Sequence, residues 1–268
     1  LTDVRETFSE PLTKEKLFVW HSFLMLGTKD VLVGTWRTHK EPMQVISGAL
    51  GKQKVHFKAP PSSFVPNEMK KFLQWYNDSS PSGKNPIKKP IVRSAIAHVY
   101  FESIHPFEDG NGRLGRCISE KALSQYVNRP VLLSLSRGID ADKKSYYHHL
   151  EKAQRSNDLT EWISYFVKTV LFAQEQTTQE VAFTLKKARF FDRYGKQLNE
   201  RQLRAVQRML EEGPQGFEGG MNARKYVGIT KASKATATRD LQDLVGKGIF
   251  IPMGGGRSTR YELALQVE

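Results

Sequence analysis

The side chains best suited to chemistry are concentrated in residues 105–116, whose sequence is HPFEDGNGRLGR. The near-neutral pKa of a histidine suits His105 to accept a proton from a hydroxyl that attacks a bound phosphate. Asp109 offers a carboxylate oxygen to a magnesium ion that bridges two phosphates and keeps most of its waters. Arg113 and Arg116 lie three positions apart, so on a helix they share one face and can bind further phosphate oxygens. Together these residue types predict a polyphosphate site.

Helical periodicity on both sides predicts that this stretch is a helix-loop-helix junction. Apolar residues recur at helical spacing in the flanking segments 91–103 and 114–123. A helix that starts near Asn111 or Gly112 presents unpaired backbone N–H groups and the positive end of its dipole to an anion. Gly110 and Gly112 let the backbone approach a phosphate closely. We expect the Asn111 amide to hold a phosphoryl oxygen and Phe107 to anchor the loop in the core.

The stretch resembles the signature of the Fic family, His-Pro-Phe-x-Asp/Glu-Gly-Asn-Gly-Arg-x-x-Arg, and every specified position is met. The resemblance implies a mainly helical domain that transfers a nucleotide monophosphate, usually AMP from Mg-ATP, to a protein hydroxyl. By position, it implies that His105 is the general base, Asp109 the magnesium ligand and residues 110–112 the anion loop, with Arg113 and Arg116 on the outer phosphates. The alternative is a junction whose histidine caps a helix and whose arginines form a solvated face.

Two further segments match what a Fic domain needs. Residues 42–61 alternate apolar and polar residues around Gly48 and Gly51, which predicts a β-hairpin. In Fic proteins a similar hairpin, the flap, aligns the target segment by strand addition, although an ordinary surface hairpin has the same pattern. The segment with Tyr146 and Tyr147 resembles the helix that borders the adenine pocket in this family. One of these tyrosines is therefore a candidate for stacking on the base, the alternative being a place in the core.

Composition restricts the class of protein. A length of 268 residues allows one large domain and a small one. The single cysteine, Cys117, excludes an internal disulfide and favours a reducing compartment, and its position on an apolar helix face predicts burial. No apolar run reaches membrane-spanning length, so we expect a cytoplasmic protein without a membrane partner. The net charge of +13 favours ATP or an acidic target surface, or serves solubility alone.

Regulation is a further expectation drawn from the resemblance. Many Fic proteins carry an inhibitory helix, Ser/Thr-x-x-x-Glu-Gly/Asn, whose glutamate pairs with the second motif arginine, here Arg116. The Glu-Gly pairs at 212–213 and 218–219 lack the required Ser or Thr, since Arg208 and Pro214 occupy that position. Because the sequence begins with Leu1 and not with methionine, we expect that an N-terminal inhibitory region is missing and that the chain is released from autoinhibition.

The composition changes near residue 196, which predicts a catalytic domain over 1–195, with a connecting helix from about 173, and a small domain over 196–268. Three amphipathic segments begin near Asn199, Asn222 and Ser233, and a hairpin with a glycine-rich tip follows. This order resembles a winged helix-turn-helix domain, whose third helix enters a major groove. The residues that the resemblance places on DNA are Lys234, Thr236, Arg239 and Arg257.

Two classes of function account for these patterns. The first is a protein adenylyltransferase that uses Mg-ATP and modifies a Ser, Thr or Tyr hydroxyl of a target docked on the hairpin 42–61, or of itself. The second is a DNA-binding transcriptional regulator whose Fic domain senses nucleotide or modifies the chain. Residues 199–268 hold 11 Lys/Arg and 8 Asp/Glu, so the small domain is only modestly basic and could instead dock a protein. DNA bound through residues 222–263 and a homodimer are the remaining partners left open, as are other nucleotide donors.

Overall fold

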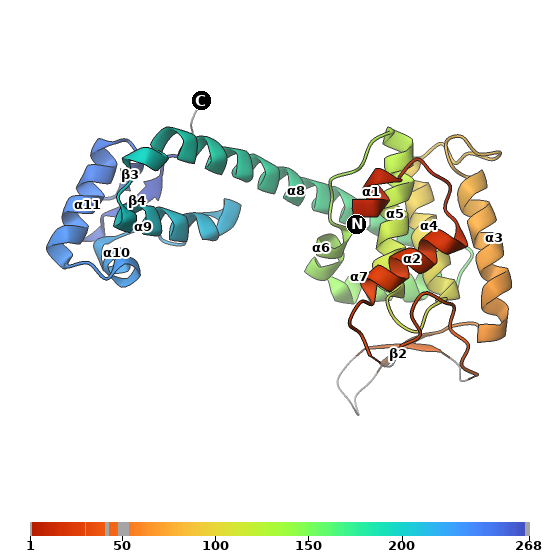
Figure 1. The fold of residues 1–268 in the computed structure, drawn as a ribbon. Coiled ribbons are helices and arrows are strands. Elements are labelled where there is room, and N and C mark those ends of the chain that lie inside the picture. The colour runs from red at the N-terminus through yellow and green to blue at the C-terminus, as the bar shows by residue number, and fades with distance from the viewer. Residues whose placement is uncertain (1, 30, 41–42, 48–53, 266–268) are drawn as a thin grey trace. The chain divides into compact units, whose positions relative to one another are not determined.

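The computed structural model describes residues 2–29, 31–40, 43–47 and 54–265, with all their side chains except those of residues 44–47, 54–56 and 257. As predicted, the described residues are mainly helical, with two antiparallel hairpins (Figure 1). Contacts divide the chain into two compact units, Leu1–Gln174 and Glu175–Glu268, here called unit 1 and unit 2. None of the helices in the described ranges combines the length and apolarity that crossing a bilayer requires.

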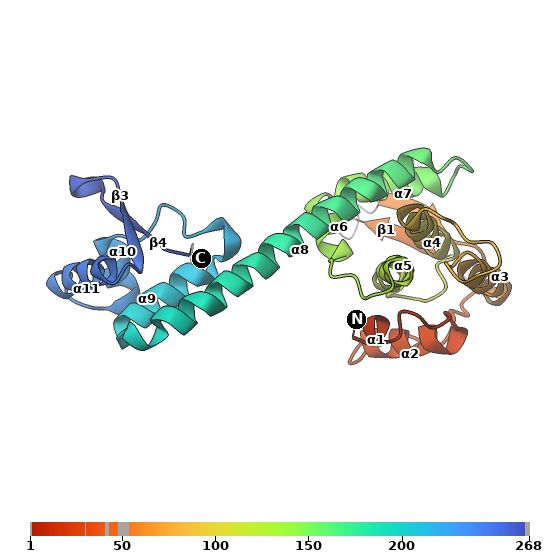
Figure 2. The same cartoon turned by 90° about the horizontal axis from the view of Figure 1, so that it is seen from above.

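Unit 1 is a helical bundle arranged around α5. Its helices are α1 (Thr2–Glu6), α2 (Lys14–Leu24), α3 (Val65–Asp78), α4 (Pro90–Ile104), α5 (Asn111–Val127), α6 (Leu135–Ala141), α7 (Lys143–Ala153) and the first part of α8 (Thr160–Tyr194). Helix α5 packs against α4 and also contacts α1, α2 and α6. Figure 2 shows α5 nearly end-on among these helices. The bundle therefore holds the start of α5, and with it the motif, on several sides.

The predicted helix-loop-helix junction is confirmed, and its ends have local causes. Pro90 occupies the first turn of α4, where its fixed φ suits a helix and its missing N–H costs nothing. Helix α4 ends at Ile104, and its C-cap, His105, adopts the left-handed conformation with φ 50° and ψ 61°. Gly110, with φ 81°, is the N-cap of α5, and a side chain there would also meet Met25 Sδ at 3.3 Å. Gly110 is therefore needed for both its backbone conformation and its lack of a side chain.

The predicted hairpin is confirmed over the residues that the structure describes. Strand β1 (Gln44–Ser47) pairs antiparallel with β2 (Lys54–Lys58), with Val45 opposite Phe57 and an irregularity in the register after Val45. The pair is extended by a hydrogen bond from the Ala59 N–H to the Met43 carbonyl, 2.9 Å long. Gly48 and Gly51, which we expected near the turn, lie outside the described residues.

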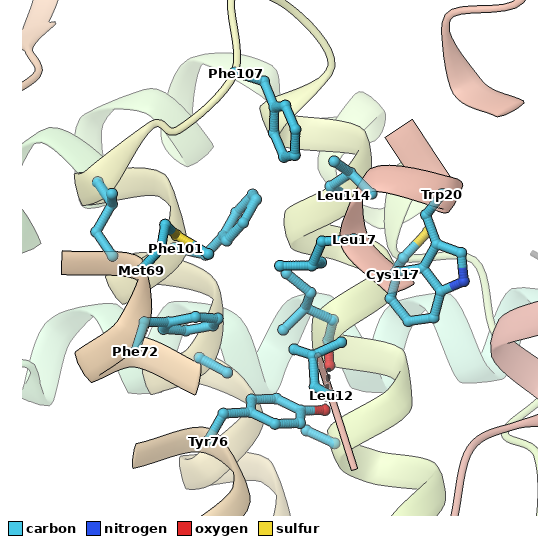
Figure 3. Close-up of a cluster of buried hydrophobic side chains, with 14 of the residues drawn as sticks. Leu12, Leu17, Trp20, Met69, Phe72, Tyr76, Phe101, Phe107, Leu114 and Cys117 are labelled. Atoms are coloured by element: carbon cyan, nitrogen blue, oxygen red, sulfur yellow. Dashed lines mark hydrogen bonds between the residues drawn. The ribbon is translucent and has the colours of Figure 1, made fainter. Parts of the chain in front are cut away.

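One apolar core joins α2, α3, α4 and α5 beneath the motif (Figure 3). Phe107 is fully buried in it, which confirms that this residue anchors the loop in the core. Burying a side chain of this size contributes about 1.5–3 kcal/mol. Cys117 is buried in the same core, as predicted. A second cluster, which includes Trp162 and Phe166 of α8, packs α7 and α8 against the other face of α4.

Unit 2 contains the three helices and the hairpin that the sequence predicts. Its elements are α9 (Glu200–Glu211), α10 (Ala223–Thr230), α11 (Lys234–Gly246), β3 (Phe250–Met253) and β4 (Arg260–Leu263). Each helix begins after a side-chain cap, provided by Asn199, Asn222 and Ser233. The sequence predicts a short second helix over residues 222–227, and α10 extends three residues further, to Thr230.

A buried polar network ties the helices of unit 2 together. The Asp240 carboxylate accepts a hydrogen bond from Arg201 Nε at 2.8 Å and another from the Tyr226 hydroxyl at 3.0 Å. Phe190 and Tyr194, in the last turns of α8, pack into the apolar core that α9, α10 and α11 form. For this reason contacts divide the chain after Gln174, within α8, whereas the composition places the boundary at 195–196.

Candidate active site

A cavity of about 290 Å³ lies at the motif in unit 1. Its wall is formed by the end of α4, the motif loop, the start of α5, one face of α7, and Met43 and Phe57 of the hairpin region. The predicted site residues that it brings together are His105, Asp109, Gly110, Asn111, Gly112, Arg116, Tyr146 and Tyr147. The cavity thus collects the expected base, anion loop and aromatic side chains in one place.

His105 combines an unusual backbone with a largely buried imidazole. Its left-handed conformation is uncommon for a residue with a side chain, and its side chain is only 12% exposed. Burial lowers the pKa of His105 to about 4. The imidazole is therefore neutral near pH 7 and able to accept a proton. This neutral, cavity-lining imidazole is what a general base requires.

Glu102 is a buried carboxyl group beside His105 that the sequence analysis did not single out. Its Oε2 lies 3.6 Å from His105 Nδ1, and burial raises the pKa of Glu102 to about 7, while the charge of Arg116 opposes that rise. The Glu102 Oε1 atom has no hydrogen-bond partner among the described residues. A side chain at Gly115 would come within 2.8 Å of this oxygen, so Gly115 makes room for the carboxyl group. Glu102 thus faces both the imidazole and the second motif arginine.

The start of α5 provides the features of an anion site. Gly110 is its N-cap, and no side chain of the described residues caps this end of the helix. The first N–H groups of the helix are therefore available to a ligand. The Asn111 amide, which we expected on a phosphoryl oxygen, instead binds both backbone groups of Phe107, at 2.9 and 2.8 Å. Asn111 consequently holds the loop in shape around the helix end.

Asp109 and the two arginines differ in how firmly the protein holds them. The Asp109 carboxylate accepts a hydrogen bond from the Gly110 N–H at 2.6 Å and forms an ion pair with Arg113 at 3.2 Å. Asp109 and Arg113 are 60% and 42% exposed, so both remain accessible to a ligand. Arg113 also donates to the Leu24 carbonyl at 3.2 Å, outside the residues that line the cavity. Arg116 lines the cavity and is half-buried.

His21 of α2 packs against the motif loop, and no sequence pattern predicted this role. Its ring stacks on Phe107 with centroids 4.0 Å apart. The Gly34 N–H donates to His21 Nδ1 at 3.0 Å, so Nε2 carries the proton and donates to the Asp109 carbonyl at 3.1 Å. Burial lowers the pKa of His21, which favours this neutral form. His21 therefore fixes the backbone of Asp109 with a single tautomer.

The two tyrosines of α7 have different settings. Tyr146 is buried, and its hydroxyl lies 2.9 Å from His98 Nε2 in the interior of the bundle. Tyr147 is half-buried, and its ring lies edge-on to Tyr146 with centroids 5.2 Å apart. Both line the cavity. Tyr146 is therefore held in the core, whereas Tyr147 is less buried at the cavity wall.

The residues predicted to bind DNA lie in unit 2. Lys234 and Arg239 are exposed on α11, whose opposite face is buried. Thr236 is half-buried, and its hydroxyl lies 2.9 Å from that of Ser233 in the cap of the helix. Arg257 is part of the short turn between β3 and β4, and its side chain lies outside the described part of the chain. Two of the four side chains are thus presented to solvent on one helix.

The residues of the motif fit a magnesium ion that takes few ligands from the protein. Among the described residues there is no group of three or more His, Cys, Asp or Glu side chains that could cage a metal. The accessible Asp109 carboxylate beside an uncapped helix end suits an ion that takes one protein oxygen and several from phosphates and water.

Comparison with known proteins identifies the domain that carries this site. Residues 11–123 match the model of the Fic/DOC family. The chain therefore contains a Fic/DOC domain. This domain includes α2 to α5 for most of their length, the hairpin and the whole motif. The cavity is completed by α7, which lies beyond the matched range.

Relatives of the Fic/DOC domain are named protein adenylyltransferases. "Protein adenylyltransferase Fic" of Nematostella vectensis is 30% identical over 113 residues, which cover 42% of this chain and 24% of that protein. "Protein adenylyltransferase fic-1" of Caenorhabditis elegans is 31% identical over 105 residues, or 39% of this chain and 19% of that protein. A probable protein adenylyltransferase of Aquifex aeolicus is 28% identical over 139 residues, which cover 48% of this chain and 41% of that protein. The matches thus span less than half of each relative.

Solved structures share the fold. A Fic family protein from Desulfovibrio desulfuricans G20 has a TM-score of 0.54 at 21% identity. The match covers the whole of this chain and 74% of that protein. A Fic domain containing signaling protein from Bacteroides thetaiotaomicron has a TM-score of 0.50 at 22% identity, with 66% of this chain and 63% of its own covered. At these identities the likeness concerns the fold alone.

Proposed function

We propose that this chain is a protein adenylyltransferase that transfers AMP from Mg-ATP to a hydroxyl group of a target protein or of itself. The observation that carries the proposal is the cavity lined by both a neutral histidine and the start of α5, a helix end that no described side chain caps. The names of the relatives of the Fic/DOC domain support the same reaction class.

In the proposed reaction His105 is the general base. The target hydroxyl oxygen attacks the α-phosphorus of ATP, and the bond from that phosphorus to the bridging oxygen of pyrophosphate breaks. His105 takes the proton of the hydroxyl, so the products are an adenylylated side chain, pyrophosphate and a protonated imidazole that later releases its proton. The low pKa of about 4 keeps the imidazole free to accept that proton near pH 7.

The rest of the site binds and orients the nucleotide in this proposal. The free N–H groups at the start of α5, Arg113 and Arg116 stabilise charge on the phosphates. Asp109 would hold the magnesium ion, which neutralises phosphate charge when bound. Tyr147 or Tyr146 would contact the adenine ring of the nucleotide. The β1–β2 hairpin would align the target by strand addition.

The test is label transfer from ATP. The purified chain is incubated with a cell lysate and with ATP that carries a radioactive phosphorus at either the α or the γ position, with and without EDTA. We expect protein-bound label from α-labelled ATP only, lost with EDTA, and intact-mass spectrometry should show adenylyl adducts. Label from γ-labelled ATP alone would instead identify phosphate transfer, and no label at all from either donor would reject ATP as the nucleotide donor.

A second function, DNA binding by unit 2, is favoured by one observation. Helix α11 buries Ala237, Leu241 and Leu244 and exposes Lys234 and Arg239 on the other side. We propose on this basis that α9–α11 and the β3–β4 hairpin act as a winged helix-turn-helix domain, with α11 in the major groove. A protein-docking role for the same domain is the competing proposal.

Salt dependence distinguishes these two roles of unit 2. If Arg239 contacts a phosphate, Arg239→Ala should weaken binding to a DNA duplex and reduce the slope of log K against log salt by about one. Fluorescence anisotropy at several salt concentrations measures this slope. Arg204→Ala, which removes an exposed arginine from α9, is the matched control and should leave the slope unchanged. Equal slopes for the wild type and both variants would show that Arg239 contacts no phosphate, and the absence of measurable DNA binding would argue for protein docking.

A further inference from the structure

Arg37 is a buried arginine that binds the backbone around His105. It is 1% exposed, and its Nε donates to the His105 carbonyl at 2.7 Å. Its Nη2 donates to the Pro60 carbonyl at 2.5 Å and lies 3.4 Å from the Ile104 carbonyl. The Arg37 N–H also donates to the Pro106 carbonyl at 2.9 Å. One residue therefore holds three consecutive carbonyls at the end of α4.

The charge of Arg37 has no acidic counterpart in the part of the chain that the structure describes. Among the described residues no carboxylate lies within ion-pair distance of it, and its Nη1 is buried without a hydrogen-bond partner. Burial lowers the pKa of Arg37 accordingly. What compensates the charge is the end of α4, where the helix dipole and the free carbonyls are negative. A buried charge that is compensated only by backbone carbonyls is a costly way to fix a chain segment, so its position beside His105 calls for a reason.

The backbone of His105 supplies such a reason. A residue other than glycine with φ 50° persists only where its surroundings hold it. Arg37 donates hydrogen bonds to the carbonyl of this residue and to those of both neighbours. These bonds fix the backbone conformation and thereby the direction of the imidazole side chain. Through Pro60, two residues beyond β2, the same guanidinium ties this conformation to the base of the hairpin.

We propose that Arg37 is a positioning residue that locks His105 in its left-handed conformation and links it to the hairpin; this inference rests on the proposed function. Arg37 does not face the nucleotide cavity, since it is not among the residues that line it. It acts on the reaction through the orientation and the charge state of the base.

The pKa of His105 depends on the charges around it and therefore provides a measure of the influence of Arg37. Burial is the main cause of the low pKa of His105, and the charge of Arg37 lowers it further. The charge of Asp109 and the backbone of Glu102 act in the opposite direction, and the Glu102 carboxyl group lies 3.6 Å away. Loss of the positive charge of Arg37 should therefore raise the pKa of His105.

The experiment compares Arg37→Met, Arg37→Lys and Arg93→Met. Arg93 is an equally buried arginine that donates to the Tyr76 and Ala122 carbonyls, away from the cavity, and so controls for the loss of a structural arginine. We expect Arg37→Met to raise the pKa of His105 in an NMR titration of the nucleotide-free protein and to lower kcat for AMP transfer by roughly 10- to 100-fold. The acid limb of the pH–rate profile should move to higher pH, and Arg37→Lys should restore part of both changes because it keeps the charge.

The outcomes separate this inference from the proposed function. A wild-type protein that transfers no AMP would reject the proposed function, while the titration of His105 would still decide whether Arg37 controls it. The inference is overturned when His105 titrates alike in the wild type and in the Arg37 variants, or when Arg93→Met changes the pH–rate profile as much as Arg37→Met does. Should Arg37→Met fail to fold, Arg37→Gln, which also removes the charge but keeps hydrogen-bond donors, provides the comparison of pKa and kcat with the wild type.

Discussion

Replacing His105 with alanine should slow AMP transfer by about 10²- to 10⁴-fold, the usual contribution of a general base. The variant removes the imidazole that would accept the proton of the attacking hydroxyl, but it leaves the start of α5, Asp109 and Arg116 in place. Binding of Mg-ATP should therefore stay within a few-fold of the wild type. Single-turnover kinetics with α-labelled ATP would measure the rate of transfer, and calorimetry would measure the affinity for ATP.

A second histidine provides the control for this experiment. His148 is exposed on α7 and does not line the cavity, so His148→Ala should transfer AMP at the rate of the wild type. If His105→Ala keeps more than a tenth of the wild-type rate, His105 is not the base. In that case Glu102, with its raised pKa of about 7, would be the next group to test in this cavity.

The local part of the site could be predicted from the sequence because it lies within one continuous segment. The periodic residues on both sides of residues 105–116 place one helix before the loop and one after it, and the structure ends α4 at Ile104 and begins α5 at Asn111. Glycine at 110 indicates a backbone that other residues avoid, which agrees with its φ of 81°. Reasoning from local sequence also placed the starts of α9, α10 and α11 near Asn199, Asn222 and Ser233, which the structure confirms.

The supporting residues of the site could not be predicted because their contacts are distant in sequence. Arg37 reaches His105 across 68 positions, and His21 reaches Asp109 across 88. A lone arginine or histidine in an unremarkable segment is most often exposed, so its sequence gives no reason to expect burial. Asn111 could not be assigned from sequence for a similar reason. An asparagine amide can bind a phosphate, but in the structure it forms hydrogen bonds with the backbone of Phe107 in the loop. Which partner a polar side chain takes depends on the tertiary structure.

The anchor of the motif loop is the second place where a large effect is expected. Phe107 is fully buried, and its ring contacts His21 at 4.0 Å and Trp36 at 4.9 Å between centroids. Its backbone is held by the Asn111 amide. The residue therefore connects the core of unit 1 to the loop between His105 and α5, so its packing contributes to both stability and the geometry of the site.

Phe107→Ala should lower the free energy of unfolding of unit 1 by about 3–5 kcal/mol, because it removes a fully buried aromatic ring and leaves a cavity. The four tryptophans, Trp20, Trp36, Trp75 and Trp162, all belong to unit 1, so their fluorescence in a denaturant titration reports on that unit alone. Phe23→Ala is the matched control, since Phe23 on α2 is 72% exposed, and it should change stability by no more than about 0.5 kcal/mol. Equal destabilisation by the two substitutions would contradict the assignment of Phe107 as the anchor, whereas a loss confined to Phe107→Ala would show that the loop depends on the core for its shape.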